Sequence, residues 1–446
     1  GKAAGLDGLT AEHLQYCHPV LCCILTKLFN LMIKVGYVPD GFGLSYTVPL
    51  PKTNYSCHTK SLTTDDFRGI SISAVISKVF ERCFLDRYER FFETSDNQFG
   101  FKKNIGCSHA IYSVKCVVDH FIKQGSTINL CALDLKKAFD KMNHHGLFLR
   151  LMDKMLPINA LSTVEYWFSI CSTCVRWGSC FSNFITLKCG VRQGGVLSPY
   201  FFAVYIDEIV EVIRRNNVGC TLGILCVGIF LYADDIVLLA PSVNALQQML
   251  TLCEDHLAYL DMTLNVKKSV CMRIGKRHKD DCCPLVTASG ENLCCTCVES
   301  CRYLGVYIVA AKSFKCSITS NKHSYYRCFN AIYSKVGHCA SEEVVIKLIT
   351  TKCLPILLYG LDACPVSTTD KHSLDFVLNR TFMKLFRTSS IEIVSICQLM
   401  FGFKKISETV IDRKRRFLQR YSNCDNIICQ TFVNAANVEL ILCGPQ

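Results

Sequence analysis

The chain has 446 residues, half of them hydrophobic and 19% of them charged. Its length is about three times the ~150 residues of one typical domain, and its composition excludes a disordered protein and a disulfide-stapled miniprotein. Lysine and arginine number 49 against 37 acids, so the net charge is +12. That charge favours a polyanionic partner such as nucleic acid, with solubility alone as the other interpretation.

In the first hundred residues, apolar side chains recur at helical spacing from Leu21 to Val35, and Gly36 supplies a C-terminal stop. A strand is predicted over Ser45 to Leu50. After a polar loop from Thr53 to Asp66, a second helix is predicted with an apolar face between Val75 and Phe84.

The central part predicts a strand, a turn into helix, a long helix, a hairpin and a further helix. These lie over Asn129–Leu133, Leu135–Asp140, Leu197–Arg215, Val218–Leu239 and Leu246–Leu260, the last with caps at Ser242 and Asn244. This order indicates an antiparallel sheet with helices on one face, an α+β layer rather than a doubly wound fold. From about Ser313 onward the pattern is helical.

The apolar run from Val218 to Ala233 is 16 residues long and ends in two aspartates. A membrane-spanning helix needs about 20 apolar residues, so the run is interpreted as paired buried strands and no membrane association is expected.

The 31 cysteines are odd in number, and the chain opens without a cleavable signal. Many lie in apolar runs, such as Leu21 to Ile24 and Leu225 to Val227, where a free thiol behaves as a small buried hydrophobe. We therefore expect an intracellular, reducing environment. The absence of an initiator methionine suggests a piece of something longer.

Two adjacent carboxylates, Asp234 and Asp235, interrupt the apolar hairpin. An exposed polar turn is the alternative, but a tight turn would favour Asn-Gly or Asp-Gly here. Burying unpaired charge is costly unless the groups bind a cation. Asp134 ends the predicted strand before it, so the aspartates of two neighbouring strands could hold two Mg²⁺ ions. Paired ions of this kind serve nucleotidyl transfer.

Between these aspartates lies a glycine-rich segment, Gly190 to Pro199. The step from Gly194 to Gly195 lets the backbone approach a ligand closely. Ser198 is predicted to cap the following helix, with Pro199 at its first position.

The segments ALDLKKAFD, GVRQGGVLSPYFFAVYIDEI and FLYADDIVLLA occur in that order and resemble motifs A, B and C of reverse transcriptases. The non-LTR (LINE-type) retrotransposon branch fits best. GKAAGLDGLTAEHL, DFRGISISAVISKVFER and NQFGFKKNIGCSHAI resemble fingers blocks, LNVKKSV resembles motif D and CRYLGVYI the primer grip. The resemblance spans residues 1 to about 310.

The resemblance implies a right-hand polymerase fold with fingers (1–125), an antiparallel-sheet palm (126–312), and a helical thumb with a C-terminal extension (313–446). It implies an RNA-directed DNA polymerase that extends a primer 3′-OH with dNTPs. The expected cofactor is a pair of Mg²⁺ ions, with Mn²⁺ as a substitute. The expected partners are an RNA template and a DNA primer, with no obligate protein partner, in a cytoplasmic ribonucleoprotein and in the nucleus during insertion.

Carried over by position, the resemblance assigns each site residue a role. The metal ligands would be Asp134, Asp234, Asp235 and the carbonyl of Leu135. Lys268 would donate a proton to pyrophosphate, with a solvated turn lysine as its alternative. The nucleotide would meet Lys52, Arg68, Phe139, Arg192, Gln193, Gly194, Gly195 and Tyr232. Phe139 would sense the sugar, with a core aromatic as its alternative. Primer and template would meet Lys102, Lys103, Tyr303, Leu304 and Gly305. Beyond the resemblance, Arg380, Lys384 and Arg387 follow helical spacing and are a candidate face for the nucleic-acid backbone, with a solvated helix surface as the alternative.

One departure from the family pattern is Gly69, which stands where proline usually follows the fingers arginine. We expect it to loosen the loop that holds Arg68. Cys294, Cys297 and Cys301 have metal-like spacing, with Cys282 and Cys283 nearby, but no histidine follows at finger spacing, which favours a cysteine-rich loop over a zinc site.

Two other functions stay open at this point. One is a group II intron-type maturase that also acts as an RNA-binding splicing factor. The other is an inactive domesticated copy that binds RNA. Intact Asp134, Asp234 and Asp235 argue against decay.

Overall fold

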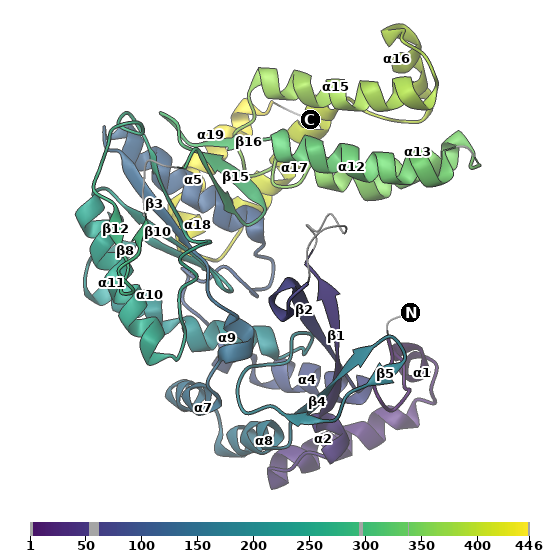
Figure 1. Cartoon of the computed structure of the whole chain (residues 1–446), viewed down its shortest axis with the longest axis vertical. Helices are drawn as coiled ribbons and strands as arrows, with labels where there is room; N and C mark the ends of the chain where they lie inside the picture. Colours follow the sequence, from purple (N-terminus) through teal and green to yellow (C-terminus); the bar gives the residue numbers. More distant parts are fainter. Residues whose placement is uncertain (1–2, 53–61, 294–297, 338, 445–446) are drawn as a thin grey trace. The chain divides into compact units, whose positions relative to one another are not determined.

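The computed structural model describes residues 3–52, 62–293, 298–337 and 339–444. The chain divides into two compact units, whose elements Figure 1 labels. The first unit comprises Gly1–Ser95, Leu135–Val212 and Asp255–Leu264, and the second comprises Asp96–Asp134, Ile213–Glu254 and Asn265–Gln446. The functional boundaries expected after residues 125 and 312 stay a prediction.

The first unit surrounds a mixed sheet with helices. Its elements are α1 (Ala11–Gln15), α2 (Val20–Val35), α3 (Asp40–Gly43), β1 (Leu44–Pro51), η1 (Thr64–Asp66), β2 (Phe67–Ser73), α4 (Val75–Tyr88), η2 (Glu89–Phe92), α6 (Ala138–Lys141), α7 (His144–Asp153), α8 (Ile158–Ser169), β4 (Ser172–Trp177), β5 (Cys180–Phe181), β6 (Ile185–Thr186) and α9 (Ser198–Ile206). The helix α10 (Glu208–Arg215) begins in this unit.

The strands β2, β1, β4 and β5 lie in that order, with β6 also on β4. Strand β1 is antiparallel to β2 and parallel to β4. Beside this sheet, α2 ends where predicted, because Gly36 takes a left-handed φ of 69°. The predicted strand at Ser45–Leu50 and helix at Val75–Phe84 are both confirmed, as β1 and α4.

The second unit joins a small sheet to a long helical segment. Its strands are β3 (Ile128–Leu133), β7 (Thr221–Leu222), β8 (Leu225–Cys226), β9 (Ile229–Tyr232), β10 (Asp235–Ala240), β11 (Val270–Ile274), β12 (Leu285–Val286), β13 (Asn292–Leu293), β14 (Ser300–Tyr303), β15 (Val306–Val309) and β16 (Lys315–Ser317). Its helices are α5 (Cys107–Lys123), most of α11 (Val243–Tyr259), α12 (Thr319–Val336), α13 (Glu342–Leu348), η3 (Ile349–Cys353), α14 (Leu354–Leu357), α15 (Thr368–Leu385), α16 (Ile391–Met400), α17 (Ile406–Ser422), α18 (Ile427–Thr431) and α19 (Val433–Leu442).

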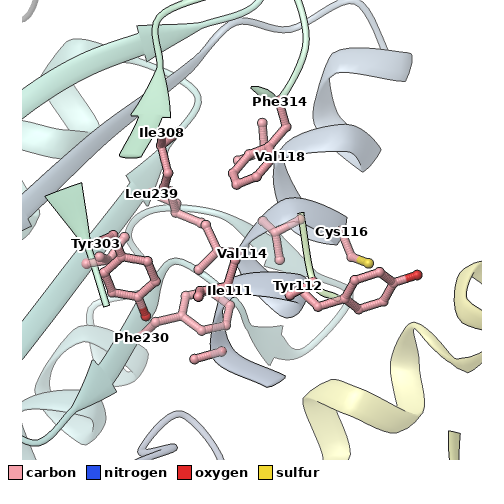
Figure 2. Packing of buried hydrophobic residues seen from close by; sticks show 14 of the residues in the cluster. Ile111, Tyr112, Val114, Cys116, Val118, Phe230, Leu239, Tyr303, Ile308 and Phe314 are labelled. Atoms are coloured by element: carbon pink, nitrogen blue, oxygen red, sulfur yellow. The ribbon is translucent and has the colours of Figure 1, made fainter. Parts of the chain in front are cut away.

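A four-stranded sheet in the order β11-β3-β10-β9 forms the centre of this unit, and every neighbouring pair is antiparallel. Helix α5 packs against it, with Ile111 and Val114 fully buried beside Phe230 and Leu239 (Figure 2). The predicted antiparallel sheet and α+β class are therefore confirmed. The apolar side chains of α5 supply the surface that this sheet needs to exclude water.

The region expected to form one hairpin over Val218–Leu239 contains two. A short hairpin joins β7 to β8 around Gly223, which has a φ of +60°, and a second joins β9 to β10. The interpretation as paired strands is confirmed, but the prediction of a single hairpin was wrong, because the chain turns at Gly223 as well as at Ala233 and Asp234.

Two predicted helix boundaries also change. The long helix expected over Leu197–Arg215 is recorded as α9 and α10, separated at Asp207, whose carboxylate accepts hydrogen bonds from the backbone N–H and the hydroxyl of Ser95. Helix α11 is capped by Ser242, whose hydroxyl accepts from the Ala245 N–H, whereas Asn244 lies inside the helix rather than at a cap.

The last third is helical, as expected. Leu374, Leu378, Phe382 and Leu385 all lie on the buried face of α15, against residues of α12 (Figure 1). Among the described residues, no helix is both long enough and apolar enough to cross a bilayer.

The cysteines that the structure describes are all free thiols. Cys226 is buried as predicted, but Cys22 and Cys23 are exposed on α2. The prediction of burial was wrong for this pair because they lie on the outer face of a helix whose inner face buries Phe29, Met32 and Ile33.

Candidate active site

The two adjacent aspartates lie at the turn of the β9–β10 hairpin. Because Tyr232 pairs with Asp235, only Ala233 and Asp234 form the turn. Ala233 has a φ of +58°, an uncommon conformation for a residue with a side chain. Such backbone strain clusters at functional sites.

Asp134 meets this turn from the neighbouring strand. Ile236 pairs with Leu133, so the next pair along the same register is Asp235 and Asp134. The hairpin and β3 thus bring together the three aspartates that the sequence singled out, although they are 100 residues apart along the chain.

The negative charges of Asp134 and Asp234 repel that of Asp235. Burial, followed by the charges of Asp234 and Asp134, raises the pKa of Asp235 to about 6. The charge of Arg302 opposes this shift. A site whose carboxylates repel one another favours a bound cation, since opposite charge stabilises the ionised form.

Asn265 is a site residue that the sequence reasoning missed. Its side-chain amide donates to Asp134 Oδ2 at 2.9 Å, and its backbone N–H donates to the Asp134 carbonyl at 2.7 Å. The signal that could have identified it is its position in the segment LNVKKSV, directly before Val266. The predicted Lys268 lies on the same turn, with Nζ 3.7 Å from Asp134 Oδ2 and a side chain 65% exposed.

Gln98 is a second residue that was missed. Its fully buried side chain accepts hydrogen bonds from the backbone N–H groups of Gly100 and Ala233. A Cβ on Gly100 would lie 2.7 Å from the Ala233 nitrogen, so only glycine fits there. Gln98 and Gly100 therefore hold the left-handed turn that carries Asp234.

The donor chemistry of this cluster fits a hard divalent cation, because carboxylate oxygens are the ligands that Mg²⁺ prefers. Among the residues that the structure describes, no three acidic, histidine or cysteine side chains are close enough to hold an ion as they stand. Leu135, whose carbonyl was predicted as a further ligand, is buried in the first unit and bridged to Leu264.

In the first unit, the glycine-rich segment forms a loop in front of α9. The backbone N–H of Ser71 donates to the Gln193 carbonyl at 2.8 Å, and the Gln193 side chain donates to Asp140 Oδ1 at 3.1 Å. Gly194 has a φ of +130°, and a Cβ there would lie 2.4 Å from the Ser71 carbonyl oxygen. The predicted close backbone approach at this loop is thus present.

Arg192 makes its contacts within the first unit. Its guanidinium donates to the Phe42 carbonyl at 3.1 Å and lies 5.5 Å from the centre of the Trp167 ring. These contacts give Arg192 a structural role in the first unit, and its predicted contact with the nucleotide stays a prediction.

Phe139 is half-buried and stacks on Phe202, with ring centres 4.5 Å apart and planes inclined by 22°. Its carbonyl accepts from the Val191 N–H at 2.8 Å. The ring is therefore packed on one face, and its backbone is joined to the loop of Gln193.

Arg68 and Lys52 lie on the β1–β2 part of the same unit. Arg68 is exposed on β2 opposite Leu50, and Lys52 Nζ donates to the Asp65 carbonyl at 2.6 Å. Gly69 is part of β2 and pairs with Pro49, so the expectation of a loosened loop was wrong. A Cβ at Gly69 would lie 2.9 Å from Thr47 Cγ2, which gives glycine a packing reason to be there.

The primer-grip residues form the β14–β15 turn. Leu304 and Gly305 have φ values of +44° and +84°, and the Tyr359 hydroxyl donates to the Leu304 carbonyl at 2.9 Å. Tyr303 is only 2% exposed and its ring packs in the core (Figure 2). The Tyr303 side chain is therefore part of the core, whereas Leu304 and Gly305 are half-buried, and the predicted contact of this turn with a primer stays a prediction.

The other predicted contacts lie apart from one another in the second unit. Tyr232 is half-buried next to the aspartate turn, and burial raises its pKa. Lys102 lies 3.9 Å from Asp96, and Lys103 is exposed. Cys294 and Cys297 lie outside the described residues, and Cys301 is buried on β14.

The basic residues of the last third are exposed but differ in setting. Lys384 donates to Asn330 and lies 5.0 Å from the centre of the Tyr333 ring. Arg380 lies over Phe376. Arg387 follows the end of α15 and has a φ of +51°, so its predicted helical spacing from the other two does not hold.

The comparison with protein families matches residues 50–308 to the model described as "Reverse transcriptase (RNA-dependent DNA polymerase)". The chain belongs to the reverse transcriptase family. This match includes all the aspartates of the turn, Asn265 and the loop of Gln193, and it agrees with the non-LTR resemblance of the sequence.

Three similar proteins come from retrotransposable or mobile elements of Drosophila and Popillia. The chain is 25% identical over 324 residues to the Pol polyprotein of the R2DM element of Drosophila melanogaster, covering 71% of the chain and 30% of the relative. It is 25% identical over 338 residues to the RNA-directed DNA polymerase of the jockey element of Drosophila funebris, covering 73% and 35%. It is 24% identical over 390 residues to the Pol polyprotein of the R2 element of Popillia japonica, covering 85% and 52%.

The chain thus spans between about a third and a half of the length of these relatives. Among solved structures, apo telomerase from Candida Tropicalis matches 95% of this chain and 70% of its own, at 12% identity and a TM-score of 0.44.

Replacing Phe139 by valine is expected to raise ribonucleotide incorporation relative to deoxyribonucleotide incorporation, because a flat ring at this position would clash with a 2′-OH. The loss of the stack with Phe202 should also lower the free energy of unfolding by about 0.5–1.5 kcal/mol, in addition to the loss from the smaller buried apolar area. Competitive incorporation of rNTP and dNTP on one template measures the ratio. Phe91→Val, which removes another half-buried ring of the first unit, is the control. An unchanged ratio together with lost stability would make Phe139 a core residue only.

Neutralising Arg380, Lys384 and Arg387 to glutamine is expected to weaken duplex binding and to reduce its salt dependence. The slope of log K against log salt should fall by up to ~0.9 for each lost phosphate contact, if the duplex behaves like B-DNA. Fluorescence anisotropy over a salt series measures it. The control is a triple variant that removes the same charge elsewhere, with exposed Lys276, Arg277 and Lys279 changed to glutamine. Equal slopes for the two triple variants would leave α15 a solvated surface.

Proposed function

We propose that this reverse transcriptase is an active RNA-directed DNA polymerase, which extends a DNA primer along an RNA template with dNTPs. The observation that carries the proposal is the joining of Asp134, Asp234 and Asp235 at one edge of the palm-like sheet, with Asn265 and Lys268 beside Asp134. A polar turn without function would have no need for three mutually repelling carboxylates.

In this proposal Asp134, Asp234 and Asp235 would hold two Mg²⁺ ions. When bound, paired ions stabilise the attacking and leaving oxygens of an in-line displacement. Asn265 fixes one oxygen of Asp134 through its amide, so that the carboxylate keeps one orientation. Gln98 performs the same task for the turn by accepting from the Ala233 N–H.

The reaction joins the primer 3′-oxygen to the α-phosphorus of the dNTP and breaks the bond to pyrophosphate. Lys268 is the proposed donor of a proton from Nζ to the departing pyrophosphate. Its exposure and its 3.7 Å distance from Asp134 leave the ammonium available at this edge of the sheet. Phe139, Gln193 and the glycine loop are the proposed sensors of the incoming nucleotide.

Primer extension on poly(rA)/oligo(dT) with dTTP and Mg²⁺ tests the proposal on the full 446-residue chain. Template-dependent product is expected, with Mn²⁺ able to replace Mg²⁺. Binding to the primer–template without extension under either ion would instead support an inactive RNA-binding copy. Omission of the template and replacement of poly(rA) by poly(dA) are the controls for template-independent addition and for template preference.

A further inference from the structure

Helix α4 carries a buried acid that has no role in the proposed chemistry. Glu81 is 2% exposed and lies between Phe80 and Phe84, which are also buried. A buried carboxylate is costly unless hydrogen bonds satisfy it. Burial raises its pKa, and the nearby charge of Arg192 opposes that shift.

The hydrogen bonds of Glu81 run to the loop that precedes α9. Its Oε2 accepts from the backbone N–H of Leu197 at 2.9 Å and also from that of Val196. The first N–H groups of a helix have no partners within the helix, and negative charge there is favourable. Helix α9 has no side-chain cap hydrogen bond, so the predicted cap at Ser198 was wrong. Glu81 instead accepts from the N-cap residue Leu197 and from Val196 directly before it.

The same loop is fastened at its other end by backbone contacts. Ser71 binds the Gln193 carbonyl, and Phe139 binds the Val191 N–H. Glu81 thus holds the C-terminal end of the loop, at Val196 and Leu197. A Cβ at Gly195 would lie 2.6 Å from Ser198 Oγ and 3.2 Å from Glu81 Oε2, so the loop fits closely against this acid.

The second oxygen of Glu81 has no hydrogen-bond partner among the described residues. Glu81 lines a cavity of about 30 Å³ together with Arg192, Trp167 and Ser198. That volume suits one or two water molecules and not an organic ligand. The cavity therefore has room for water that binds the second oxygen of Glu81, and it is too small to be a second ligand site.

We propose that Glu81 is a positioning residue for nucleotide selection, which sets the conformation of the loop from Gln193 to Leu197 by accepting its two N–H groups. The proposal rests on the proposed polymerase function for its kinetic consequence. Its structural consequence, the protection of those two amides, does not depend on activity.

The test compares Glu81→Gln and Glu81→Ala with Asp86→Asn, an exposed acid on the same helix that pairs only with Arg82 among the contacts described. Glutamine keeps the size and one acceptor oxygen, whereas alanine leaves two buried N–H groups without partners. Steady-state extension gives kcat and KM for dTTP, anisotropy gives primer–template affinity, and hydrogen exchange follows the peptide covering residues 191–200.

Glu81→Ala is expected to lower kcat/KM for dTTP about ten- to a hundredfold, the range expected for hydrogen bonds to a charged group. Primer–template affinity should stay unchanged, and Glu81→Gln should retain part of the activity. Hydrogen exchange in residues 191–200 should accelerate in Glu81→Ala and stay near the wild-type rate in Asp86→Asn.

Unaltered exchange of these amides in Glu81→Ala would overturn the proposal, even if the wild-type chain proved inactive. A kinetic loss that affects kcat, KM and primer–template affinity equally and follows the fraction of folded protein would also overturn it. An inactive wild-type chain that shows the expected exchange pattern would contradict the polymerase function and leave the loop assignment supported.

Discussion

Asp134→Asn and Asp234→Asn are each expected to reduce primer extension by at least about 10³-fold while primer–template binding stays near the wild-type level. The ions that these carboxylates hold supply several kcal/mol of transition-state stabilisation, and each 1.36 kcal/mol is tenfold in rate. Asparagine preserves the shape of the side chain and removes the negative charge. Single-turnover extension measures the chemical step, and anisotropy measures binding.

Asp281→Asn is the matched control, because Asp281 is an exposed acid of the same unit. It should extend primers at the wild-type rate. Near-native extension by either Asp134→Asn or Asp234→Asn would refute the assignment of these residues as metal ligands. A parallel loss of binding would show that the substitution disturbs the fold rather than the chemistry.

Gly194→Ala is expected to abolish most polymerase activity and to lower the melting temperature of the chain. The residue has a φ of +130°, and the added Cβ would meet the Ser71 carbonyl oxygen at 2.4 Å. Backbone strain of this kind costs on the order of 1–3 kcal/mol, and the carbonyl cannot yield without disturbing β2. Steady-state kinetics for dTTP and thermal unfolding measure the two effects.

The variant Gly178→Ala separates the effect of backbone strain from the effect of a clash with β2. Gly178 also has a positive φ, of +62°, but nothing lies within 4 Å of its would-be Cβ. Its substitution carries strain without a clash and should cost about 1 kcal/mol with little effect on dTTP kinetics. If the two variants proved equally active, the close approach of Gly194 to β2 would not matter for nucleotide selection.

The elements that the sequence predicts best are those whose signals are local. The run from Asn129 to Leu133 is apolar and ends at Asp134, and it forms β3 within one residue of the predicted bounds. The hairpin at Asp234 follows from an apolar run interrupted by charge. The aspartates were found for the same reason, since carboxylates inside an apolar run violate the pattern around them.

The residues that were missed or misplaced depend on partners far along the chain. Glu81 and Val196 are 115 positions apart, so no local pattern could assign the cap of α9 to Glu81. The contacts of Arg192 with Phe42 and Trp167 likewise join residues far apart in the sequence, and no local pattern indicates them. The burial of Tyr303 also depends on distant partners, because β14 pairs with β15 and both contribute to the core that α5 covers.

The interleaving of the two compact units along the chain has a consequence for folding. The first unit draws on three separate stretches, so its closing contacts join residues far apart in sequence, such as β1 with β4. Such non-local contacts raise the contact order and slow folding, because loop closure must precede the contacts that reward it. Neither unit is a continuous segment that a ribosome completes before starting the other. Isolating the first unit as a stand-alone protein would require two new junctions, from Ser95 to Leu135 and from Val212 to Asp255.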